Sequence, residues 1–124
     1  MPIKYLHSDI TEKVIGVLFS VYNEMGFGYQ EKYYYRAIKN ALTGLGFQVS
    51  EQLLTKIIVA DKVIGRYFLD FLVDGVVVLE IKVADQIYNQ HIRQVLGYLK
   101  ANNLKVGIIG VFSKHGVIIK RVIN

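Results

Sequence analysis

The 124 residues fit one domain, residues 1–124, around a single hydrophobic core, and 52% hydrophobic with 20% charged residues exclude an intrinsically disordered chain. The absence of cysteine excludes a disulfide scaffold and a thiolate metal site. Without a signal peptide or an apolar run of about 18 residues, we expect a soluble, cytoplasmic protein that does not enter a membrane. A net charge of +5 favours a polyanionic partner such as nucleic acid, although many basic proteins bind none.

The chain is predicted to begin with two helices. Apolar residues recur at spacings of three and four over residues 11–24, and Ser8 or Asp9 stands where a helix cap is expected. A glycine-containing loop then leads to a second helix that starts at Glu31 and closes near Gly44. The predicted inner face of this second helix consists of Tyr34, Ala37, Ile38, Ala41, Leu42 and Leu45.

The middle of the chain predicts a three-stranded meander. Residues 48–60 are rich in β-branched and other apolar residues and reach a turn at Asp61 and Lys62. The stretch 66–83 then holds two further short strands that meet at an Asp-Gly turn.

A third helix over residues 85–102 and two final strands, 106–112 and 117–123, complete the predicted order ααβββαββ. Because the third helix crosses over from the third strand to the fourth, we expect an α/β sandwich. Its mixed central sheet has about five strands and is flanked by helices.

The third predicted strand carries charge where a core strand would carry none. Glu80 and Lys82 fall on one face with Val78, while apolar residues fill the other face, and Asp70 on the preceding strand lies between two apolar neighbours. Buried charge is costly unless it is paired, hydrogen-bonded or bound to metal. We therefore predict that these three residues share a divalent-metal site; the alternative is an ion-pair network at the sheet surface.

This charged pattern resembles the motif of the PD-(D/E)xK nuclease superfamily, in which Asp70 is followed after nine residues by Glu80-Ile81-Lys82. The resemblance implies a restriction-endonuclease-like fold and metal-dependent hydrolysis of phosphodiesters in nucleic acid, with DNA favoured. Non-catalytic nucleic-acid-binding and assembly modules of the same fold are the alternatives.

Two further motifs resemble the small GxxExxY group within that superfamily. They are Gly28-x-x-Glu31-x-x-Tyr34 and, downstream, Gln94-x-x-x-Tyr98. The resemblance runs in order from about Thr11 to the C-terminus. One departure is Val111-Phe112, where the group tends to have Asn-Phe, so a polar role there is absent.

The residue types suit Mg²⁺ or Mn²⁺, because hard cations take oxygen ligands. Asp70, Glu80 and the carbonyl of Ile81 can hold the ion, and Lys82 can orient a water or offset charge that develops on phosphorus. The resemblance adds Glu31 to the metal ligands; otherwise its carboxylate simply favours the positive end of the helix dipole.

The third helix presents His91, Gln94 and Tyr98 at spacings of three and four, so we expect a polar-tipped face that looks towards the site. In the resembling motif, Gln94 and Tyr98 support the lysine or contact the scissile phosphate. The alternative is an ordinary exposed helix face. A chain this short offers little surface for reading bases, so a homodimer that recognises nucleic-acid shape is a plausible subclass.

The hairpin between the two charged strands makes a geometric prediction. A two-residue loop at Asp74 and Gly75 would place Asp70 and Glu80 on opposite faces. We therefore predict a three-residue loop or a bulge, which puts both carboxylates on the same face.

Overall fold

The computed structural model describes residues 6–124, which form three helices and five strands in the predicted order. The elements are α1 (Ser8–Met25), α2 (Glu31–Gly44), β1 (Val49–Val59), β2 (Lys62–Val73), β3 (Val77–Val83), α3 (Asn89–Ala101), β4 (Val106–Ser113) and β5 (Gly116–Ile123). No helix within residues 6–124 is long and apolar enough to cross a membrane.

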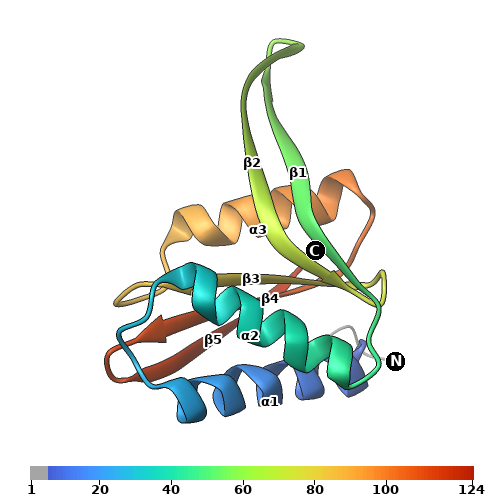
Figure 1. Cartoon of the computed structure of the whole chain (residues 1–124). Coiled ribbons are helices and arrows are strands. Elements are labelled where there is room, and N and C mark those ends of the chain that lie inside the picture. Colours follow the sequence, from blue (N-terminus) through green and yellow to red (C-terminus); the bar gives the residue numbers. More distant parts are fainter. Residues whose placement is uncertain (1–5) are drawn as a thin grey trace.

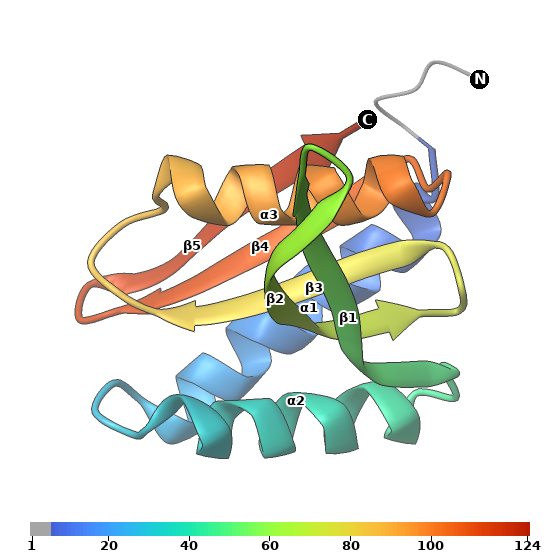
Figure 2. The same ribbon diagram turned by 90° about the horizontal axis from the view of Figure 1, so that it is seen from above.

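The five strands form one mixed sheet in the order β1-β2-β3-β4-β5. All neighbouring strands are antiparallel except β3 and β4, which are parallel and are connected through α3. Helices α1 and α2 cover one face of the sheet and α3 covers the other (Figures 1 and 2). The expected α/β sandwich is therefore confirmed, with the restriction-endonuclease-like element order.

Two hydrophobic clusters fill the two faces. The larger cluster packs α1 and α2 against the sheet, and its fully buried members include Leu18 and Ile38. The smaller cluster packs α3 against the other face through Val95 and Leu99. β3 and β4 contribute to both clusters because their alternate residues are buried on opposite sides.

The first two strands extend beyond the rest of the sheet. β1 and β2 pair along nearly their whole length, whereas β2 pairs with β3 only over Phe71–Val73. The remaining part of the β1–β2 hairpin therefore projects from the body of the protein as a two-stranded ribbon (Figure 1).

Several predicted boundaries shift by a few residues. The N-cap of α1 is His7, so Ser8 and Asp9 lie in the first turn instead of capping it. The turn between β1 and β2 is formed by Ala60 and Asp61, whose φ angles of 50° and 63° suit a tight two-residue hairpin turn. Leu45 was expected on the inner face of the second helix, but α2 ends at Gly44 and Leu45 is 58% exposed.

The third helix begins later than predicted, at Asn89 instead of residue 85. The Asp85 carboxylate accepts a hydrogen bond of 2.5 Å from the Tyr88 hydroxyl. Tyr88 is the N-cap and has an extended backbone (φ −100°, ψ 150°), so the helix cannot begin before Asn89.

Candidate metal centre

The hairpin between β2 and β3 brings the two predicted carboxylates together. Val73 pairs with Val77, which leaves a three-residue loop, Asp74–Val76. The same register, continued past the last ladder pair, sets Asp70 opposite Glu80, and the Asp70 N–H donates to Glu80 Oε1 at 3.2 Å. The prediction of a three-residue loop is therefore confirmed.

At Asp70, the side chains of β2 change from one face of the sheet to the other. Leu69 packs in the cluster under α3, whereas Phe71, two residues along the same strand, packs in the cluster under α1 and α2. Residues two apart on a regular strand face the same side, so the strand changes phase between them. On β1, Gln52 has a φ of 53° at the matching position. This paired irregularity places the Asp70 side chain at the edge of the sheet instead of on one face.

Beyond Leu79, β2 no longer pairs with β3, and two carboxylates accept hydrogen bonds from this unpaired edge of β3. The Ile81 N–H donates to Asp70 Oδ2 at 2.8 Å, and the Val83 N–H donates to Glu31 Oε1 at 3.1 Å. Within a strand, the N–H and C=O of one residue point to the same edge, as the doubly bonded pairs of an antiparallel ladder require. The carbonyl of Ile81 therefore lies on the edge where Asp70 is bound.

The lysine of the motif lies beside this pair. Lys82 Nζ is 3.8 Å from Glu80 Oε2, and the Lys82 side chain is 30% exposed whereas that of Glu80 is 3% exposed. The ammonium group thus reaches from the buried carboxylate towards solvent.

The electrostatics of the site favour a bound cation. Burial raises the pKa of Asp70, and burial together with the adjacent Asp70 carboxylate raises the pKa of Glu80 to about 9. Lys82 lowers both pKa values without cancelling the effect of burial. A divalent cation would relieve the repulsion between the two carboxylates, so the donor set fits a hard metal ion.

Glu31 is held apart from this pair by its bond to Val83. Within residues 6–124, no three His, Cys, Asp or Glu side chains gather into a metal-binding group. The donors that the structure brings together are therefore Asp70, Glu80 and the Ile81 backbone, and Glu31 lies farther along the same edge.

A groove of about 510 Å³, lined by three acids (Glu31, Glu51 and Asp70) and three bases, opens beside the carboxylate-lined edge. Its lining includes Lys32, Arg36 and Lys39 from α2. Their spacing of four and three residues puts them on one helical face, a pattern present in the sequence that the sequence analysis did not use.

The predicted polar face of α3 is only partly present. His91 and Gln94 are partly exposed, whereas Tyr98 is 9% exposed and packs in the cluster under α3, so the face is less exposed than expected. Val78 of the same cluster shares its face of β3 with Glu80 and Lys82, so Tyr98 lies on the side of the sheet that carries these two residues.

His91 and Gln94 approach the site from different directions. Burial, and then the charge of Lys82, lowers the pKa of His91, and its Nδ1 atom is buried without a hydrogen-bond partner within residues 6–124. The backbone carbonyl of Gln94 accepts a 2.8 Å hydrogen bond from the Tyr67 hydroxyl. Tyr67 was not predicted, because a tyrosine in an alternating strand gives no distinctive pattern.

Tyr34 is a core residue. Its hydroxyl donates to the Gly26 carbonyl at 2.6 Å, and its ring packs edge-on against Phe112 at 4.6 Å between centroids. The tyrosine thus ties the loop between α1 and α2 to the sheet, just before Glu31.

The mixed sheet, its flanking helices and the carboxylates beside a lysine define a protein of the restriction-endonuclease-like class. A family model described as the PD-(D/E)XK nuclease superfamily matches residues 8–122, and the chain belongs to that superfamily. Its members generally use divalent metal ions, and the superfamily implies a nucleic-acid substrate.

Other comparisons add little. Among solved structures, the chain is similar to the crystal structure of SSO0001, with 16% sequence identity and a TM-score of 0.49. The alignment covers 97% of this chain and 80% of that one. A search of curated proteins finds no match.

Proposed function

We propose that the protein is a nuclease that hydrolyses phosphodiester bonds in nucleic acid, with DNA favoured, and that Mg²⁺ or Mn²⁺ is its metal ion. The observation that carries this proposal is the pair of half-buried Asp70 and buried Glu80, with Lys82 Nζ 3.8 Å from Glu80. We further propose that the chain is a single domain of the GxxExxY group and acts in the cytoplasm.

In this proposal, Asp70, Glu80 and the Ile81 carbonyl hold the ion, and Glu31 contributes from the same strand edge. A bound divalent ion polarises a phosphate and lowers the pKa of a bound water. Lys82 positions the attacking water, or offsets negative charge that develops on the phosphate, because its ammonium lies next to Glu80 and reaches solvent.

The α3 residues have supporting roles in this proposal. Gln94 fixes Tyr67 through its backbone carbonyl, and Tyr98 packs beneath the same helix, so both hold α3 in place against the sheet. Neither is proposed to contact the phosphate directly.

Two cations at the border of the groove beside the carboxylate-lined edge suit the nucleic-acid backbone. Lys39 is paired with Glu51 at 2.8 Å, whereas Lys32 and Arg36 lie over the ring of Tyr33, 5.2 and 5.6 Å from its centroid. These two exposed cations border the groove that contains Asp70, so a phosphate bound to them would be close to the carboxylates.

The test is cleavage of single-stranded, duplex and branched DNA and of RNA, with Mg²⁺ or Mn²⁺ and with EDTA as control. We expect metal-dependent cleavage, and Lys82→Ala should lower turnover by about 10² or more with a much smaller loss of affinity. Lys114→Ala, at the exposed β4–β5 turn, is the matched control and should keep the wild-type turnover.

Two outcomes would contradict the proposed nuclease activity. If wild type binds these nucleic acids but cleaves none of them with either metal, the chain is the non-catalytic binding module. If it neither binds nor cleaves them, the charged strand residues serve only an ion-pair network.

A further inference from the structure

The projecting part of the β1–β2 hairpin exposes an unusual amount of apolar surface. We call residues 54–68 the arm and residues 57–64 its tip. Seven large apolar side chains of the arm are 43–65% exposed: Leu54, Ile57, Ile58, Val59, Val63, Ile64 and Phe68. An isolated two-stranded ribbon is only marginally stable in water, so exposure on this scale calls for a covering surface.

The exposed area is close to what an interface needs. At these exposures, seven large side chains present roughly 700 Å², spread over both faces of the ribbon: Leu54 and Phe68 are cross-strand partners on one face, and Ile57 lies on the other. A standard protein–protein interface buries about 800 Å² from each partner. The arm alone therefore supplies most of one side of a stable interface.

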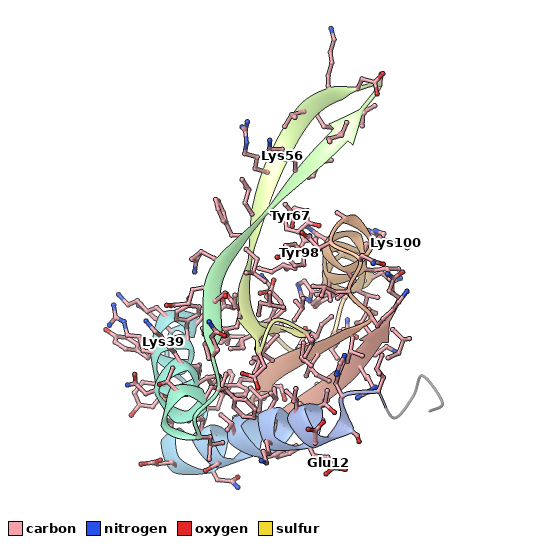
Figure 3. All side chains as sticks on the ribbon, turned by 90° about the vertical axis from the view of Figure 1, so that its right-hand side faces the viewer. Glu12, Lys39, Lys56, Tyr67, Tyr98 and Lys100 are labelled. Atoms are coloured by element: carbon pink, nitrogen blue, oxygen red, sulfur yellow. The ribbon has the colours of Figure 1, made fainter. Side chains whose placement is uncertain are left out.

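The same chain also carries a surface that could receive an arm. A groove of about 650 Å³ lies between the arm and α3, lined by Ile57, Ile58 and Tyr67 from the arm and by Arg93, Gly97 and Ala101 from α3. At the base of the arm, the Tyr67 hydroxyl donates to the Gln94 carbonyl and links the arm to α3. The arm and α3 approach closely there, because a Cβ at Gly97 would lie 3.2 Å from the same hydroxyl. Figure 3 shows Tyr67 at this base, next to α3.

The tip of an arm borders the groove of its own molecule, through Ile57 and Ile58, without filling it. β1 and β2 run without interruption to the tight turn at Ala60 and Asp61, and their register shifts only once, between Ile57 and Ile58. The arm leans over the side of the sheet that α3 covers, and its turn lies beyond that helix (Figures 2 and 3). The groove between the arm and α3 stays open, so side chains of another molecule can enter it.

We propose that the occupant is a second copy of this chain and that the protein forms a twofold dimer by exchanging arms. Each copy offers one tip and one groove, so a twofold axis buries both tips and both grooves at once. The arms cross, and each tip lies between the arm and α3 of the other copy.

Two features of the arm favour this occupant over others. The tip carries one acid, Asp61, and one base, Lys62, and its other six side chains are apolar, which suits an apolar protein surface. The register shift near Ile58, together with Lys56 opposite Arg66, disfavours edge-to-edge pairing of ribbons, since bulges and charges are the usual protection of strand edges.

The first test measures the mass of the protein in solution by sedimentation equilibrium, without nucleic acid or metal. We expect a dimer of about twice the 14.1 kDa of one chain. The double variant Ile58→Glu/Ile64→Glu should raise the dissociation constant at least about 30-fold, because each change places a charge in a central apolar contact. Phe19→Glu, which alters an exposed apolar residue on α1, is the control and should leave the dimer intact.

The second test uses the absence of cysteine from the sequence. Lys62→Cys, at the tip, and Arg93→Cys, in the groove, are mixed and oxidised with copper phenanthroline. We expect a disulfide-linked heterodimer, whereas Lys62→Cys mixed with Asn40→Cys, on α2, should give none.

The outcomes separate this proposal from the proposed nuclease. A monomeric wild type, or cross-linking of Lys62→Cys only to itself, overturns the arm exchange and leaves the nuclease untouched. A monomer whose nucleic-acid binding is lost in the double tip variant assigns the arm to nucleic acid instead. Asp70→Asn should dimerise as wild type does, even though it is expected to lose metal binding.

Discussion

Replacing Asp70 by Asn should change how the stability of the metal-free protein depends on pH. Burial raises the pKa of the Asp70 and Glu80 carboxyls above their values in the unfolded chain. A group whose pKa is raised by folding stabilises the fold fully below its unfolded pKa, and this stability is lost as the pH rises through the folded pKa. The wild-type protein should therefore become less stable from about pH 5 to about pH 9.

The slope of unfolding free energy against pH follows from the number of protons that the protein takes up on folding. With Glu80 protonated in the folded protein up to a pKa of about 9 and ionised in the unfolded chain, folding takes up one proton over this range. One proton corresponds to a loss of about 1.4 kcal/mol in unfolding free energy per pH unit. Asp70→Asn removes the neighbouring carboxylate, so the pKa of Glu80 should fall, the slope should flatten and the variant should be more stable than wild type at pH 8.

The assay is urea denaturation in EDTA at several pH values, with Glu12→Gln, an exposed acid on α1, as control. Adding Mg²⁺ at about 100 times its dissociation constant should stabilise wild type by about 2.7 kcal/mol and leave Asp70→Asn unchanged. A flat pH profile for wild type, or an equal Mg²⁺ effect in both proteins, would refute the assignment of Asp70 and Glu80 as a strained metal pair.

Three smaller predictions follow from neighbouring contacts. Arg36→Ala should weaken nucleic-acid binding and reduce the slope of log K against log salt by about 0.9, as titrations at several salt concentrations would show, whereas Lys105→Ala should not. Tyr34→Phe removes the donor to the Gly26 carbonyl, and urea denaturation should show a loss of about 1 kcal/mol without loss of metal binding. Gly110→Ala places a Cβ 2.7 Å from Leu18 Cδ1 in the core, and the same assay should show a loss of about 1–3 kcal/mol.

The sequence predicted the order of the elements and the register of the central hairpin. Both follow from periodicity, together with the requirement that Asp70 and Glu80 meet. The phase change at Gln52 and Asp70 could not be predicted, since alternation does not encode the left-handed φ of Gln52. Nor does it indicate that a strand leaves its sheet, because the apolar runs of the arm, such as Ile57-Ile58-Val59, are those of an ordinary buried strand.

The point where β2 leaves β3 explains why the charged residues and the arm occur in one protein. Pairing between the strands ends at Phe71 and Leu79, so the next outward-pointing N–H groups on β3, those of Ile81 and Val83, need other acceptors. Carboxylates from Asp70 and Glu31 accept from them, which places acidic oxygens along a backbone edge that also presents a carbonyl. Beyond the same point, β2 has only β1 as a partner, and the two strands continue outward as the arm. A single divergence of two strands thus creates both the carboxylate-lined edge and the projecting apolar ribbon.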